Sequence, residues 1–136
     1  MPAMPLAEDI ITARYSIQAY ESGRITINEK HYQESLILSP QQMIAPWSVG
    51  SIDELQPDLL ADIFALKPDV VLLGTGDTQV FPDISILGAF AQHGLGVEVM
   101  NTGALCRTFN ILVAEDRNVV AAIILAPIEK AAGDLQ

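Results

Sequence analysis

Residues 69–126 read DVVLLGTGDTQVFPDISILGAFAQHGLGVEVMNTGALCRTFNILVAEDRNVVAAIILA, and this stretch decides the fold. Three largely apolar runs, at 70–73, 97–100 and 119–126, alternate with two stretches whose apolar residues recur at helical spacing. Short apolar runs between helices are typical of parallel strands that are covered on both faces. The stretch therefore predicts a strand–helix–strand–helix–strand unit, for which right-handed crossovers are the rule.

Upstream of this unit, apolar and polar residues alternate as they do in strands with one buried face. Two such runs, at 15–20 and 25–27, flank the turn residues Ser22-Gly23 and predict a β-hairpin. A third strand is predicted at 34–38, and Pro40 ends it. The chain is thus predicted to be an α/β protein that opens with a hairpin.

Local signals mark the start of each predicted helix. Ser51-Ile52-Asp53-Glu54 matches a capping box, which predicts a first helix that ends before Pro68. Pro82-Asp83 opens a second helix, and Ile84 is expected on its apolar face. Thr102 is predicted to cap a third helix, which carries one apolar stripe.

The length of 136 residues predicts a single domain, spanning 1–136, with a poorly ordered lead-in at 1–14 and a compact core at 15–128. Seventeen acidic residues against seven basic ones give a net charge of −10. Such a chain has no basic stripe for nucleic acid or for an anionic membrane surface. The single cysteine and the lack of a secretory signal predict a cytoplasmic protein. The longest apolar run has eight residues, which predicts a soluble protein that does not insert into membranes.

The sequence Gly74-x-Gly76 resembles half of a dinucleotide-binding fingerprint, because it follows a strand and precedes a helix. Gln79, however, stands where a third glycine would allow close packing, and the helix begins only at Pro82. We therefore expect no nucleotide cofactor. The isolated histidines His31 and His93 have no metal-ligand spacing, so we expect no metal.

Small polar residues follow two of the predicted strands at the point where each strand ends. Ligands of parallel α/β sheets bind outside these carboxyl ends, so the residues predict a polar rim for a small, anionic ligand. The alternative is structural: the glycines form a tight turn, and Thr102 is only a helix cap. The residues of this predicted rim are Thr75, Gly76, Asp77, Asn101, Thr102, Arg107 and Asn110.

Cys106, Arg107 and Trp47 each allow a structural and a functional interpretation. A thiolate at Cys106 would be favoured near a helix start and beside Arg107, yet free cysteines are among the most buried residues. Arg107 is expected to face Asp77 or Glu98 and to form an ion pair, which would serve either the structure or a function. Trp47 either plugs the core over a sheet edge or, if exposed, marks a partner surface.

Three segments resemble the signature of a small uncharacterised domain family: Leu73-Gly74-Thr75-Gly76, Glu98-Val99-Met100-Asn101-Thr102 and Cys106-Arg107-Thr108-Phe109-Asn110. That family includes a mitochondrial respiratory complex I assembly factor, an adipogenesis-associated protein and bacterial stand-alone domains. The resemblance covers about residues 15–126. It implies a three-layer fold, with a central mixed, mostly parallel sheet flanked by helices and a small extra N-terminal sheet. No reaction is established for the family, so it implies no catalytic residues.

Two hypotheses for function follow. The first is a non-enzymatic protein-interaction module like an assembly factor, which the resemblance and the lack of a complete catalytic constellation favour. Its partner would be a protein, and the resemblance implies that this protein belongs to a respiratory complex. The second is a domain that binds or converts a small molecule at the polar rim. The sequence leaves the oligomeric state open.

Overall fold

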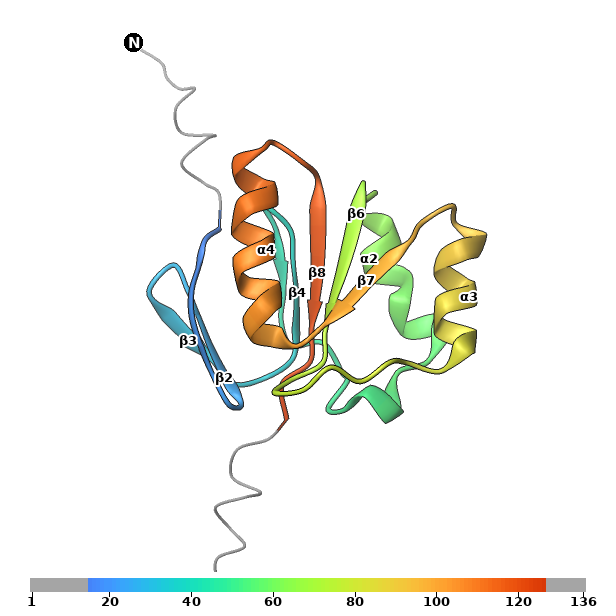
Figure 1. The fold of residues 1–136 in the computed structure, drawn as a ribbon, viewed down its shortest axis with the longest axis horizontal. Coiled ribbons are helices and arrows are strands. Elements are labelled where there is room, and N and C mark those ends of the chain that lie inside the picture. The colour runs from blue at the N-terminus through green and yellow to red at the C-terminus, as the bar shows by residue number, and fades with distance from the viewer. Residues whose placement is uncertain (1–14, 127–136) are drawn as a thin grey trace, which may run out of the picture.

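The computed structural model describes residues 15–126 (Figure 1). The predicted lead-in at 1–14, the last two residues of the predicted core and the tail beyond them lie outside the described residues. The predicted α/β fold class is confirmed: a five-stranded mixed sheet has helices on both faces, beside a separate three-stranded antiparallel sheet. No helix within residues 15–126 is long and apolar enough to cross a membrane.

The elements follow one another in the order expected for a small sheet that precedes an α/β unit. The small sheet contains β1 (Ile17–Glu21), β2 (Arg24–Ile27) and β3 (Lys30–Tyr32). The main sheet contains β4 (Leu36–Leu38), β5 (Met43–Ile44), β6 (Val70–Gly74), β7 (Val97–Met100) and β8 (Val119–Ile123). The helical elements are η1 (Ile52–Glu54), η2 (Pro57–Leu60), α2 (Ala61–Ala65), α3 (Ile84–Gln92) and α4 (Thr102–Ala114).

The main sheet has the strand order β5-β4-β8-β6-β7. β6 is parallel to both of its neighbours, β7 and β8, whereas β4 is antiparallel to β8. The predicted unit at 69–126 is therefore confirmed, and its first and second strands are adjacent. The strand predicted at 34–38 is β4, which belongs to the main sheet. The small sheet takes its third strand from β3, which the sequence patterns did not predict.

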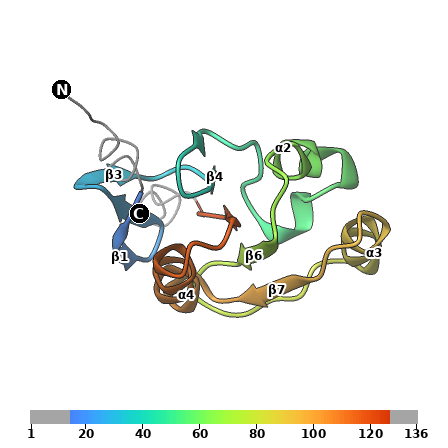
Figure 2. The same ribbon diagram turned by 90° about the horizontal axis from the view of Figure 1, so that it is seen from above.

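Both faces of the main sheet are buried, as the apolar runs predicted. α4 and the small sheet cover one face (Figure 2). On this face Leu72 and Ala121 lie in a common core with Phe109. α2, α3 and the loop that contains Trp47 cover the other face, together with Val71 and Val120. Successive residues of one strand point to opposite faces, so the Val-Val-Leu-Leu run of β6 fills both cores.

The predicted capping box at 51–54 is wrong. Ser51 makes no side-chain cap, and Glu54 Oε1 instead accepts a hydrogen bond of 2.7 Å from the amide of Gly50. Only a short 3-10 turn forms there, because Gln56 precedes Pro57 and is extended (φ −128°, ψ 153°). The predicted first helix is thus divided into η1, η2 and α2.

Two finer predictions about the later helices are also wrong. Ile84 is exposed, and the apolar face of α3 is formed by Ile86 and Phe90, which are four residues apart and lie on the same side of the helix. The cap of α4 is Asn101 rather than Thr102: Asn101 Oδ1 accepts a hydrogen bond of 2.8 Å from the amide of Ala104.

Candidate functional site

The polar rim predicted from the sequence lies where β6 ends and α4 begins. Thr102 Oγ1 accepts a hydrogen bond of 2.9 Å from the Gly76 amide, and the Thr102 amide donates one of 2.8 Å to the Gly76 carbonyl. Thr102 is fully buried. Thr75 Oγ1 donates to the carbonyl of Thr78 at 2.6 Å and accepts from the amide of Val80 at 3.1 Å. These side chains use their hydrogen-bonding groups to shape the loop itself.

Asp77 lies in the same loop but faces the small sheet. Its two carboxylate oxygens accept hydrogen bonds from the hydroxyls of Tyr20, at 2.7 Å, and Ser22, at 2.8 Å. These bonds, the one from Tyr20 first, hold the pKa of Asp77 below its usual value. Burial and the nearby carboxylate raise the pKa of Tyr20 above its usual value. Asp77 therefore joins the main loop to the β1–β2 hairpin.

Asn110 holds the small sheet against α4. Its Oδ1 accepts a hydrogen bond of 3.0 Å from the amide of Ile17, and its Nδ2 donates one of 2.7 Å to the Ile17 carbonyl. The side-chain amide thus pairs with one residue of β1 as a neighbouring strand would. This position explains why an amide is needed in the middle of an otherwise amphipathic helix.

Replacing Asn110 with alanine is expected to destabilise the protein by about 1–3 kcal/mol, because the amide and carbonyl of Ile17 both lose their partner. Urea denaturation measures the loss, and amide hydrogen exchange at Ile17 should become faster. Gln92→Ala removes an exposed amide at the end of α3 and is the control. An Asn110→Ala protein as stable as this control would contradict the assigned role.

Arg107 and Cys106 lie beside Asn110, along a cleft of about 340 Å³ between β1 and α4. The guanidinium of Arg107 is exposed and forms no ion pair within residues 15–126, so the predicted pairing with Asp77 or Glu98 is wrong. Cys106 is buried, and burial raises the pKa of its thiol to about 11. The thiol is therefore protonated at neutral pH, which fits the structural interpretation of Cys106.

The structure thus divides the seven predicted rim residues into two groups. Five of them lie where β6 and β7 end and α4 begins, and Arg107 and Asn110 lie further along α4, at the β1 cleft. None of these five residues lines the β1 cleft, the hollow beside the 45–50 loop, or the cavities at the 39–42 loop and at η1. Binding of a ligand at this rim stays a prediction. No three His, Cys, Asp or Glu side chains among the described residues are placed to hold a metal ion.

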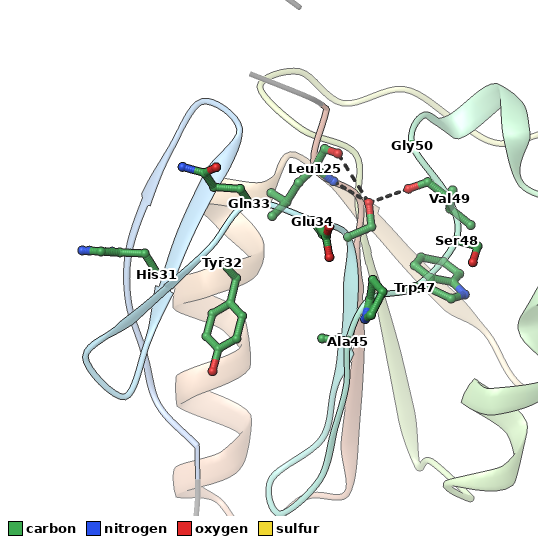
Figure 3. A pocket seen from close by; sticks show the side chains of 12 residues that line it. His31, Tyr32, Gln33, Glu34, Ala45, Trp47, Ser48, Val49, Gly50 and Leu125 are labelled. Atoms are coloured by element: carbon green, nitrogen blue, oxygen red, sulfur yellow. Dashed lines mark hydrogen bonds between the residues drawn. The ribbon is translucent and has the colours of Figure 1, made fainter. Parts of the chain in front are cut away.

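A hollow of about 720 Å³ lies between β3 and the 45–50 loop (Figure 3). Trp47 is 5% exposed, and its Nε1 donates a hydrogen bond of 3.1 Å to the Leu59 carbonyl on the side of the core. Ser35 accepts a hydrogen bond of 2.9 Å from the amide of Leu125. Figure 3 shows His31 and Trp47 on opposite sides of the hollow.

A group of three exposed apolar side chains lies in the segment from the end of β6 to the first residue of α3, and the sequence patterns did not predict its exposure. We call it the apolar ledge, and it consists of Val80, Phe81 and Ile84, which are 40%, 64% and 80% exposed. Gln79 fixes its position, because Gln79 Nε2 donates a hydrogen bond of 2.9 Å to the Val99 carbonyl of β7. The only signal in the sequence is a Val-Phe pair inside a polar loop.

Several known proteins and solved structures are similar to most of this chain. A protein of Francisella tularensis subsp. holarctica named 13 kDa major membrane protein is 34% identical over 122 residues, which are 89% of this chain and 99% of that protein. The human NADH dehydrogenase (ubiquinone) 1 alpha subcomplex assembly factor 3 is 34% identical over 113 residues, which are 82% of this chain and 61% of that protein. This chain thus spans about three-fifths of the assembly factor's length.

The solved structure is that of a Xanthomonas campestris protein determined by NMR. It has 38% sequence identity and a TM-score of 0.78, and the match covers 84% of this chain and 86% of that one. A family model described as "Protein of unknown function (DUF498/DUF598)" matches residues 17–124, which include every strand and helix from β1 to β8. The predicted membership in a small uncharacterised family is therefore confirmed: the chain belongs to the DUF498/DUF598 family of proteins of unknown function.

Proposed function

We propose that this protein is a non-enzymatic interaction module that holds a partner protein during the assembly of a larger complex. The names of the assembly-factor relatives support this role, including one from Rattus norvegicus that is 33% identical over 117 residues. By the same likeness, the partner is a subunit of a respiratory complex. A location in the cytoplasm stays a prediction from the sequence.

The observation that carries the proposal is the apolar ledge. Isolated apolar side chains on a surface need no explanation, but neighbouring ones that stay in water are typical of a binding surface. Three of the four large apolar side chains exposed within residues 15–126 belong to the ledge. Phe81 is of the aromatic type that contributes most at the centre of interfaces.

The apolar ledge lies beside an open edge of the main sheet, which affects how a partner can bind. β7 pairs with β6 only, so its other side is an open strand edge within the described chain. The side chain of Gln79 covers part of this edge at Val99. A covered edge blocks pairing with unrelated chains. A partner is therefore expected to be recognised by side chains at the ledge.

The double variant Phe81→Ser and Ile84→Ser is expected to lose most of its partner binding while it keeps its fold, because both side chains are exposed. The partner is identified by mass spectrometry after capture from an extract of the source organism, and it is then purified. The dissociation constant should rise by at least about tenfold, equivalent to about 1.4 kcal/mol.

The matched control is Ile111→Ser, which removes a 58% exposed apolar side chain on α4, away from the ledge. This variant should bind like the unmodified protein. Circular dichroism and the melting temperature confirm that each variant is folded. Equal binding by the double variant and the control would contradict the proposal.

A second candidate function, the binding of a small anionic molecule, is supported by the position of Arg107. Its exposed guanidinium lines the β1 cleft and has no ion-pair partner within residues 15–126. Inorganic phosphate and citrate are suitable probes. A ligand at about 100 times its dissociation constant stabilises a protein by about 2.7 kcal/mol. We expect this stabilisation in a thermal-shift measurement, and Arg107→Gln should remove it; equal shifts in both proteins would contradict a site at Arg107.

A further inference from the structure

The charges of this protein are distributed unevenly along the chain. Between Lys30 and Arg107 there is one basic residue of the Lys or Arg type, Lys67, against nine acidic ones. This stretch therefore carries a formal charge of −8 out of the total of −10. It includes the apolar ledge and every element on the α3 face of the main sheet. The acidic residues are Glu34, Asp53, Glu54, Asp58, Asp62, Asp69, Asp77, Asp83 and Glu98.

A groove of about 310 Å³ is lined by two of these acidic residues and by Phe81 of the apolar ledge. It lies between η1 and the start of α3, and both apolar and acidic side chains line it. Phe81 belongs to the ledge and to the groove, so one ligand can contact both. The apolar lining residues are Ile52, Leu55, Phe81 and Pro82, and the acidic ones are Asp53 and Asp83.

The two carboxylates in the groove are available to a cation. Neither Asp53 nor Asp83 forms an ion pair with another residue of the described chain. Asp83 Oδ2 accepts a hydrogen bond of 3.0 Å from the amide of Ser85, which caps α3 and favours the charged form. Lys67, the one basic residue of the acidic stretch, follows the end of α2 and does not line the groove.

We propose that this groove binds a basic, apolar segment of a partner protein, in which an arginine or lysine stands beside a large apolar side chain. The inference rests on the proposed function and specifies the chemistry of the partner. The apolar side chain would cover Phe81, and the cation would lie near Asp53 and Asp83. Arginine suits this position because its guanidinium also stacks on aromatic rings. An acidic partner would be repelled by Asp53 and Asp83 and by the net negative charge of the chain.

The probe is a fluorescein-labelled peptide in which leucine–arginine pairs are separated by glycine and serine. Two further peptides carry glutamine or glutamate in place of arginine. Fluorescence anisotropy with the full chain should give a dissociation constant for the arginine peptide at least about tenfold below that for the glutamine peptide. The preference should fall between about 0.1 M and about 1 M salt, as the Debye length falls from about 10 Å to about 3 Å.

The variant that tests the site is Asp53→Asn with Asp83→Asn, because asparagine caps a helix as well as aspartate does. It should bind the arginine and glutamine peptides equally. The control is Asp62→Asn with Glu115→Gln, which removes the same charge at exposed positions outside the groove and should keep the preference. If both double variants lose the preference for the arginine peptide to the same extent, the peptide is attracted only by the net charge of the protein. That result would overturn the proposed site.

The two proposals can fail separately. If Phe81→Ser with Ile84→Ser loses the purified partner but the peptides bind without regard to charge, the partner chemistry inferred here is wrong and the interaction module stands. If the ledge variant keeps its partner, the proposed function at the ledge fails. In that case, charge-dependent binding of the arginine peptide at Asp53 and Asp83 would still support a basic ligand for the groove.

Discussion

Replacing Phe109 with alanine is expected to lower the free energy of unfolding by about 3–5 kcal/mol. Phe109 is fully buried on α4, in the core that α4 shares with the main sheet and the small sheet. An alanine would leave a cavity that neither sheet can close without moving. Because a domain of this kind has a total stability of about 5–15 kcal/mol, the loss is a large fraction of it.

Urea denaturation followed by circular dichroism measures this effect. Amide hydrogen exchange should show that β1 and β2 lose protection first, since α4 is what holds Ile17 and Ile25 against the main sheet. The control is Ile111→Ala on the same helix, where the side chain is 58% exposed, and the expected change is below about 0.5 kcal/mol. Similar losses in the two variants would contradict the assigned core.

Replacing Gly74 with valine is expected to destabilise the protein by about 3 kcal/mol, because the end of β6 touches the start of α4. A Cβ atom at Gly74 would lie 2.9 Å from Leu105 Cδ1 and 3.0 Å from Thr102 Oγ1. The Thr102 hydroxyl cannot yield without losing its hydrogen bond to the Gly76 amide. The two γ-methyl groups of valine add further overlap.

Thermal and urea denaturation measure the effect of Gly74→Val. The matched control is Gly88→Ala in α3, where an added Cβ meets nothing within 4 Å. Since glycine is a poor helix former, this control should be neutral or stabilising by up to about 1 kcal/mol. A Gly74→Val protein with wild-type stability would show that α4 does not pack against β6 at this point.

These contacts also explain why the sequence resembles a dinucleotide-binding motif. Gly74 leaves room for α4, and Gly76 has a φ of +94°, which favours glycine. Gly76 thus makes the turn that the structural interpretation of this loop predicts, whereas Gly74 serves packing. The pattern alone could not distinguish these uses, because it does not show which helix approaches the strand.

The α/β class, the parallel β6–β7 pair and the helices at α3 and α4 followed from the sequence, because period and apolar content are local properties. The position of β4 did not follow, because a three-residue apolar strand fits either sheet. The exposure of Ile84 was missed for a related reason: a helix of nine residues with many apolar side chains has several plausible buried faces.

For the candidate sites too, some features follow from the sequence and others only from the tertiary structure. The sequence by itself determined the fold class, the family and the acidic character of the chain, because each depends on residue types in order. Only the tertiary structure decided that Asp77 pairs with Tyr20, that Asn110 holds β1, and that Phe81 remains in water beside two carboxylates that form no ion pair within residues 15–126. Such features depend on which distant segments meet, and apolar side chains at a surface have the same pattern in sequence as those in a core.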